Sequence, residues 1–198
     1  MTSEVENYKE QVKVFDLDGK FLGIRDKTSL YKDIRKEWKK KKKVTKQVHT
    51  IRIFVMNKRG GIYFAKRSKL KKENTGLYDK TIGGHIRGDE PKEYTLLREC
   101  SEELGFPGAV LVEPEFTEAL KEGDLDRVGV FKKVETINAF QANYRYKDGS
   151  VATFPQITTI YLGVYDGHVK FKDDETSGIE IFYPDEIADE LKENPEKY

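Results

Sequence analysis

The chain has 198 residues and a formal net charge of +1, with 36 basic and 35 acidic side chains. This near-neutral balance gives no whole-molecule attraction to nucleic acids or membrane surfaces, so nucleic acid is not an expected partner. The single cysteine excludes an intramolecular disulfide, and no apolar run approaches the roughly 18 residues of a membrane span. The first twenty residues lack an apolar signal core, so we expect a globular, cytoplasmic protein.

The N-terminal part is predicted to form a hairpin and then a helix. Short apolar runs on both sides of Asp18-Gly19 are typical of a β-hairpin. Over residues 29–43, Leu30, Ile34 and Trp38 recur at i, i+4 and i+8, which predicts a helix with one apolar face.

Both ends of this helix carry recognisable signals. Thr28 or Ser29 is expected to cap its N-terminus. The run Lys39–Lys43 is expected to end the helix, where cations interact favourably with the helix dipole. Given the neutral net charge, a solvated helix end explains these lysines better than a phosphate-binding role.

Strands dominate the rest of the chain, so we expect a sheet packed by helices. Residues 115–127 give no clear pattern. The predicted strands are 49–57 and 62–68 as partners across a turn at 58–61, then 109–112, 134–146 and 154–165 joined by a turn at 147–150, 168–171, and 179–183. The predicted helices are 91–104 and 184–193.

The segment Gly84–Phe106 concentrates acidic side chains behind a glycine-rich loop. Glu99, Glu102 and Glu103 stand at i, i+3 and i+4, so their carboxylates project from one helix face over a single turn. Two carboxylates about 6 Å apart repel by roughly 3 kcal/mol at an effective dielectric near 20. Such a turn suits a hard cation, Mg²⁺ or Mn²⁺, whose remaining ligands are often substrate phosphates. The segment therefore predicts metal-dependent phosphate chemistry.

The same segment resembles the signature of the Nudix hydrolase family. That signature is Gly, five residues, Glu, seven residues, Arg-Glu, an apolar residue, any residue, Glu-Glu, any residue, Gly and an apolar residue. The matching positions are Gly84, Glu90, Arg98-Glu99, Cys100, Glu102-Glu103, Gly105 and Phe106. The one soft departure is the cysteine at the apolar position, and a buried cysteine behaves as a small hydrophobe.

The resemblance implies metal-dependent hydrolysis of a diphosphate linkage, in a nucleoside diphosphate joined to another moiety. The glutamates that match Glu99, Glu102 and Glu103 bind Mg²⁺ or Mn²⁺ in that family, and the carbonyl that matches Gly83 often joins them. Arg98 is expected to orient a glutamate, with Glu90 as its partner. A box glutamate, Glu102 or Glu103, or else a glutamate from a distant loop, would activate the attacking water.

The distant base is left open at this point. Glu175, Glu180, Asp173 and Asp174 are the candidates near the last predicted strand. Each of them alone is more typical of a solvated loop acid.

Several side chains are candidates for substrate binding. Lys66, Arg67 and Lys69 end a predicted strand, and cations of this kind bind phosphates well. Alternation places Lys66 and Arg67 on opposite faces, so only one of them is expected to face the site. His85 is expected either to touch substrate or to make a structural hydrogen bond. Aromatic residues on strands are more often core or interface residues, although some could stack a base. The five candidates are Tyr144, Tyr146, Phe154, Phe182 and Tyr183.

Four stretches extend the resemblance: Phe15–Arg25, Phe64–Ser68, Gly76–Asp79 and Gly83–His85. With them, residues 12 to about 192 resemble the Nudix branch that is similar to isopentenyl diphosphate isomerase. That isomerase requires a cysteine immediately before the Gly-His pair, where this chain has Gly83, and the only cysteine is Cys100. Hydrolysis is therefore the preferred activity. The isomerase reaction and a catalytically silent nucleotide-binding module are the alternatives.

The resemblance implies an α+β fold, a Nudix-type α/β/α sandwich with a mixed β-sheet. Residues 1–45 would form an N-terminal extension packed on a hydrolase domain of residues 46–198. The expected partner is a small-molecule diphosphate substrate, and assembly as a homodimer is plausible by the same resemblance.

Overall fold

The computed structural model describes residues 10–171 and 174–198. The strands are β1 (Gln11–Phe15), β2 (Phe21–Asp26), β3 (Gln47–Met56), β4 (Ile62–Arg67), β5 (Tyr78–Asp79), β6 (Ile82–His85), β7 (Gly108–Val110), β8 (Gly129–Arg145), β9 (Val151–Val164) and β10 (Thr176–Phe182). The helices are α1 (Lys27–Lys41), α2 (Lys92–Glu99), α3 (Glu115–Glu122) and α4 (Pro184–Glu193), with a π-helical turn η1 (Cys100–Leu104) and a 3₁₀ turn η2 (Pro195–Lys197).

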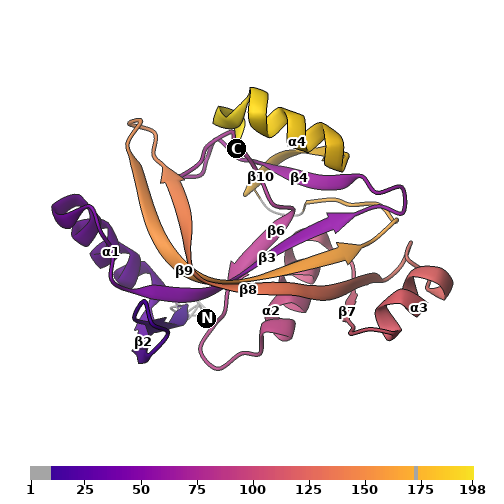
Figure 1. Ribbon diagram of the computed structural model, residues 1–198, viewed down its shortest axis with the longest axis horizontal. Helices are drawn as coiled ribbons and strands as arrows, with labels where there is room; N and C mark the ends of the chain where they lie inside the picture. The colour runs from indigo at the N-terminus through magenta and orange to yellow at the C-terminus, as the bar shows by residue number, and fades with distance from the viewer. Residues whose placement is uncertain (1–9, 172–173) are drawn as a thin grey trace, which may run out of the picture.

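The central sheet runs in the order β10-β4-β3-β9-β8-β7. It is mixed, because β3 lies parallel to β9 and β7 parallel to β8, whereas β8 and β9 form a long antiparallel hairpin. Figure 1 shows this hairpin curling through the molecule, with α1 near one of its ends and α3 near the other. The α+β class and the mixed sheet are confirmed.

One edge of β3 is shared by three different strands. β1 pairs with it at residues 47–48, β6 at residues 50–53, and β4 only at Met56, opposite Ile62. The predicted turn at 58–61 forms, but β4 then runs along β10 instead of β3. The expectation that 49–57 and 62–68 are partners was therefore right only at the turn, since β6 occupies the edge that β4 leaves.

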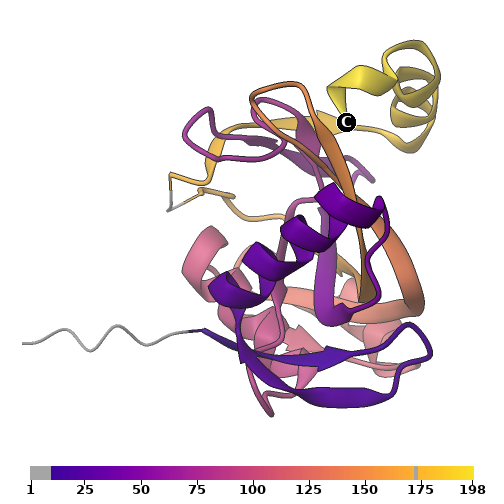
Figure 2. The same cartoon turned by 90° about the vertical axis from the view of Figure 1, so that its left-hand side faces the viewer.

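The N-terminal residues form the predicted hairpin and helix. Val12, Val14, Leu30 and Ile34 are buried in one cluster with residues of β3 and β9, among them Phe154. Figure 2 shows α1 lying over this side of the molecule, above the β1–β2 hairpin. The extension therefore contributes to a shared core.

One detail of the extension and one later strand differ from expectation. Asp26 caps α1, because its side chain accepts a hydrogen bond of 2.8 Å from the Ser29 backbone, so neither Thr28 nor Ser29 is the cap. Residues 168–171 have no strand structure. Their apolar side chains Val169 and Phe171 pack against the main core from irregular backbone, which explains the apolar pattern without a strand.

The main core lies between α2 and the sheet. Leu96, Cys100 and Leu104 are fully or nearly buried against β3 residues such as Ile51 and Ile53. This packing fixes the apolar side of the α2–η1 segment and leaves its glutamates on another side, where Glu99 is buried and Glu102 is exposed. Within the described ranges, no helix is long and apolar enough to cross a bilayer.

Candidate active site

The acidic turn is built by α2 and η1 together. The helix predicted at 91–104 is α-helical to Glu99 and then widens into a π-turn, which ends at Gly105 in a left-handed conformation with φ of 76°. The Gly105 N–H donates to the Cys100 carbonyl at 2.8 Å, which closes the turn. Glu99, Glu102 and Glu103 all line one pocket.

Arg98 connects the carboxylates of this turn. Its Nη2 lies 2.9 Å from Glu99 and 3.2 Å from Glu90, and its Nη1 lies 3.1 Å from Glu102. Burial lowers the pKa of Arg98, but the neighbouring carboxylates, Glu99 first, outweigh this and raise it. The guanidinium thus stays charged and fixes the orientation of the glutamates around it.

The glycine pair of β6 allows the close approach of these groups. A Cβ on Gly84 would collide with the Glu99 carboxylate, and a Cβ on Gly83 would lie 2.6 Å from the Ile51 carbonyl. Glycine at both positions is therefore required by the packing. It lets the Glu99 carboxylate lie directly against the β6 backbone.

The donors fit a hard divalent cation in kind. Carboxylates and a backbone carbonyl are the oxygen ligands that Mg²⁺ and Mn²⁺ prefer, and Gly83, Glu99, Glu102 and Glu103 line the same pocket. Among the described residues, however, no group of three or more such side chains already stands close enough to hold an ion. Arg98 holds Glu99 and Glu102, and the Glu102 side chain, 53% exposed, has room to turn.

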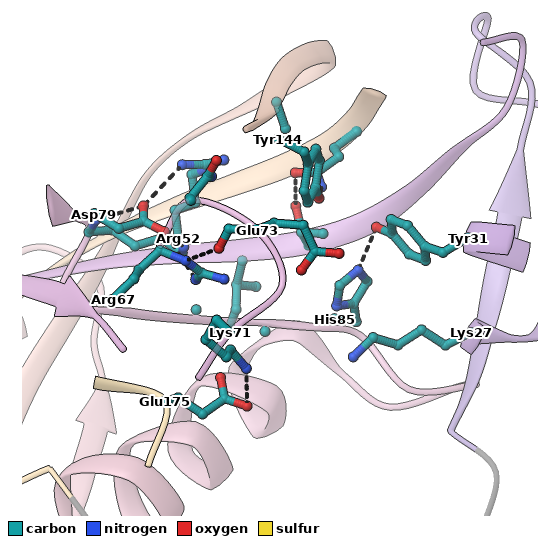
Figure 3. Close-up of a pocket in the computed structure, with 18 of the residues that line it drawn as sticks. Lys27, Tyr31, Arg52, Arg67, Lys71, Glu73, Asp79, His85, Tyr144 and Glu175 are labelled. Carbon is teal, nitrogen blue, oxygen red and sulfur yellow. Dashed lines mark hydrogen bonds and ion pairs between the residues drawn. The ribbon is translucent and has the colours of Figure 1, made fainter. Parts of the chain in front are cut away.

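The pocket has a volume of about 800 Å³ and extends well beyond the acidic turn. Side chains of α1, β3, β4, β5, β6, β8, β9 and the segment 71–74 also line it. Figure 3 shows cationic and aromatic groups from these elements facing a common space.

Three cationic side chains surround Asp79, which lines the pocket. The Asp79 carboxylate lies 2.9 Å from Lys80, 3.6 Å from Arg67 and 3.8 Å from Arg52. Although burial raises the pKa of Asp79, these cations hold it at about 2. Arg52 is the cross-strand partner of Gly83, so the excess positive charge lies beside the expected metal donors.

His85 joins the glycine loop to α1. Its Nε2 lies 2.7 Å from the Tyr31 hydroxyl, and burial lowers the pKa of His85 to about 3. The ring is therefore neutral at ordinary pH and makes a structural hydrogen bond, one of the two alternatives for this residue. It also lines the pocket.

The strand-end cations separate as alternation requires. Arg67 lines the pocket, whereas the exposed Lys66 lies with its Nζ 5.0 Å from the Tyr78 ring, outside the set of lining residues. Lys69 also lies outside that set, and its carbonyl accepts a hydrogen bond from Lys147.

The candidates for a distant base fall in different places. Glu175 lines the pocket and pairs with Lys71, as Figure 3 shows. Glu180 is hydrogen-bonded to Tyr78 away from the pocket, and Asp174 lies in an exposed turn. Asp173 lies outside the described residues.

Of the five aromatic candidates, only Tyr144 lines the pocket. Phe154 and Tyr146 belong to the core shared with the extension. Phe182 packs among other rings near the C-terminus, and Tyr183 precedes α4. The core interpretation of strand aromatics therefore describes most of this set.

Sequence reasoning missed the pocket-facing residues of the extension. Lys27, Tyr31 and Arg35 line the pocket from α1. Their spacing of four residues was a readable signal, because it places them on one helix face, next to the apolar face of Leu30 and Ile34. Arg52 and Asp79 carried no comparable signal.

Comparison with known proteins shows the family of the chain. The model of the NUDIX domain matches residues 46–198, so this chain belongs to the Nudix family, whose members hydrolyse diphosphate bonds. The structure of DR0079 from Deinococcus radiodurans is similar, with a TM-score of 0.64 and 16% identity over 93% of this chain and 90% of that one. A MutT protein from Methanosarcina mazei Go1 gives a TM-score of 0.44 and 17% identity over 73% of this chain and 90% of that one. No curated protein matches the sequence.

Proposed function

We propose that this enzyme cleaves a diphosphate linkage in a nucleoside diphosphate joined to another moiety, with Mg²⁺ or Mn²⁺. The observation that supports this is the sharing of one pocket by Glu99, Glu102, Glu103 and the cations around Asp79. A phosphate chain between them would meet oxygen donors for an ion on one side and positive charge on the other.

The ligands of the ion would be the carboxylates of Glu99, Glu102 and Glu103 with the carbonyl of Gly83. Once bound, such an ion supplies charge neutralisation at the phosphates and Lewis acidity that makes water a better nucleophile. Arg98 keeps its carboxylate partners oriented.

The remaining steps belong to the chain's own side chains. Glu102 or Glu103, or Glu175, which lines the same pocket, would accept the proton of the attacking water. Arg67, with Arg52, would hold phosphate oxygens, and His85 would contact the substrate as a neutral ring. Lys66, which lies outside the pocket lining, is the weaker candidate of the two strand-end cations.

The isomerase alternative is not favoured. Gly83 stands where that reaction needs a cysteine, and Cys100 is buried in the main core, where burial raises the pKa of its thiol. We propose that residues 12 to about 192 are related to the isomerase-like branch without sharing its reaction. Assembly as a homodimer and a cytoplasmic location complete the proposal.

The decisive experiment is a hydrolysis screen with Mg²⁺ or Mn²⁺ over nucleoside diphosphate sugars, dinucleotides and prenyl diphosphates, with both products identified. We expect Glu103→Gln to lower kcat by about 10²–10⁴-fold, the usual contribution of a positioned acid or base. Glu118→Gln, an exposed position on α3, is the matched control. If the wild-type protein turns over no substrate with either ion, the silent binding module replaces the hydrolase.

A further inference from the structure

Helix α1 directs some of its side chains into the core and others into the pocket. Leu30 and Ile34 are buried in the core shared with β3 and β9. Lys27, Tyr31 and Arg35, spaced by four residues, line the pocket from the adjacent face, where Tyr31 also packs against that core. The extension therefore supplies part of the pocket wall, although it lies outside the residues that match the family model.

The segment 71–74 completes this wall. Glu73 pairs with Arg35 and so ties the segment to α1, while Lys71 pairs with Glu175. In Figure 3, Glu73 lies between the Tyr31–His85 pair and the group around Asp79. Arg35 Nε is buried without a hydrogen-bond partner, so this guanidinium has one donor that the described residues leave unused.

The charges of the pocket are unevenly matched. Among the described residues, nine lysine and arginine side chains and seven carboxylates line it, and three of those carboxylates belong to the acidic turn. Each of the other four already has a cation as partner: Glu10 with Lys27, Glu73 with Arg35, Asp79 with Lys80 and Glu175 with Lys71.

Positive charge consequently remains on the α1 side. Lys32 of α1 and Lys72 of the segment 71–74 both line the pocket, and within the described residues neither takes part in an ion pair. They flank the Arg35–Glu73 pair from its two elements. An anion bound in the pocket would give Lys32 and Lys72 a partner of opposite charge.

We propose that Lys32, Arg35 and Lys72 form a second anion subsite, which binds a phosphoryl group other than the two joined by the cleaved bond. This inference rests on the proposed hydrolysis and narrows its substrate. The substrate then carries at least three phosphoryl groups. The third is either the end of a nucleoside triphosphate or a phosphate ester on the moiety linked to a nucleoside diphosphate.

The first test measures binding without turnover. Tripolyphosphate is titrated calorimetrically in EDTA into the wild type, Lys32→Gln/Lys72→Gln and the control Lys36→Gln/Lys40→Gln. The control removes the same charge from exposed positions of α1 outside this pocket. We expect the pocket variant to raise Kd about tenfold, from the loss of two exposed charges that both line the pocket, and the control to change it by less than about twofold. Equal effects in the two variants overturn the subsite.

The second test measures KM with Mg²⁺ for three substrates: a nucleoside triphosphate, a nucleoside diphosphate sugar, and the same sugar with a phosphate ester. The pocket variant is expected to raise KM about tenfold only where the third phosphoryl group is present, with kcat unchanged. The substrate that shows this loss identifies the source of the group. A uniform rise across all three contradicts the proposal, and absence of any hydrolysis refutes the proposed function while the binding result stands separately.

Discussion

Gly84 shows how a single hydrogen atom can decide the geometry of the acidic turn. Its position leaves no space for a Cβ beside the Glu99 carboxylate. Gly84→Ala should therefore displace Glu99, lower stability by about 1–3 kcal/mol and reduce kcat/KM by roughly 10²-fold. Urea unfolding and the hydrolysis assay measure the two effects.

Gly178→Ala is the control for this substitution, because a Cβ there would meet nothing within 4 Å. It should change stability by no more than about 0.5 kcal/mol. If the two alanine variants behave alike, the close approach of Glu99 to β6 does not determine the site.

His85 makes stability depend on pH. Burial lowers the pKa of His85 to about 3 and that of His49 to about 4, whereas an unfolded histidine titrates near 6.5. The unfolded chain therefore binds more protons below pH 6.5. Stability is highest above that pH and falls as the pH decreases toward 3. The decrease is at most about 1.4 kcal/mol per pH unit for the buried His85 and smaller for His49, which is partly exposed and therefore screened by solvent.

Replacing the buried ring should remove one of these two contributions. We expect His85→Gln to flatten the plot of unfolding free energy against pH between 6.5 and 4.5, measured by urea titration. An unchanged slope in His85→Gln would mean that the ring is protonated as easily in the folded protein as in the unfolded chain.

At the scale of the elements, the sequence pattern predicted the position of α1 well but gave the wrong residue as its N-terminal cap. Apolar spacing gave the helix, but Asp26, two residues before Thr28, makes the capping hydrogen bond. Asp26→Ala should cost about 0.5–2 kcal/mol of stability. Thr28→Ala should cost no more than about 0.5 kcal/mol, and a larger loss in Thr28→Ala than in Asp26→Ala would reverse the assignment.

Strand pairing was harder to infer than strand position. The residues of β3 and β4 were located closely, yet their partners depend on which strand reaches the β3 edge first, and that competition is tertiary. The same limit applied to residues 168–171, whose apolar side chains reach the core from an irregular segment. The apolar pattern indicates which side chains are buried, but it does not indicate whether a strand or an irregular segment carries them.

For the whole molecule, the acidic turn could be read from sequence because its members lie within a few residues of each other. The pocket around it could not, since Arg52, Asp79, Tyr144 and Glu175 meet only after the sheet has formed. Tyr31 reaches His85 across 54 positions of the chain. Residues that are separated in this way leave no periodic trace, and their meeting is a property of the complete fold.

The core that α1 shares with β3 and β9 implies that the extension unfolds together with the rest of the chain. Trp38, the only tryptophan, lies on α1 and packs against that core, so its fluorescence reports on the extension. Far-UV circular dichroism reports on the whole chain. We expect the two urea transitions to coincide in midpoint and slope, as for one cooperative unit. A fluorescence transition at lower urea than the dichroism transition would show that the extension detaches first, and the α1 wall of the pocket would then be lost before the acidic turn.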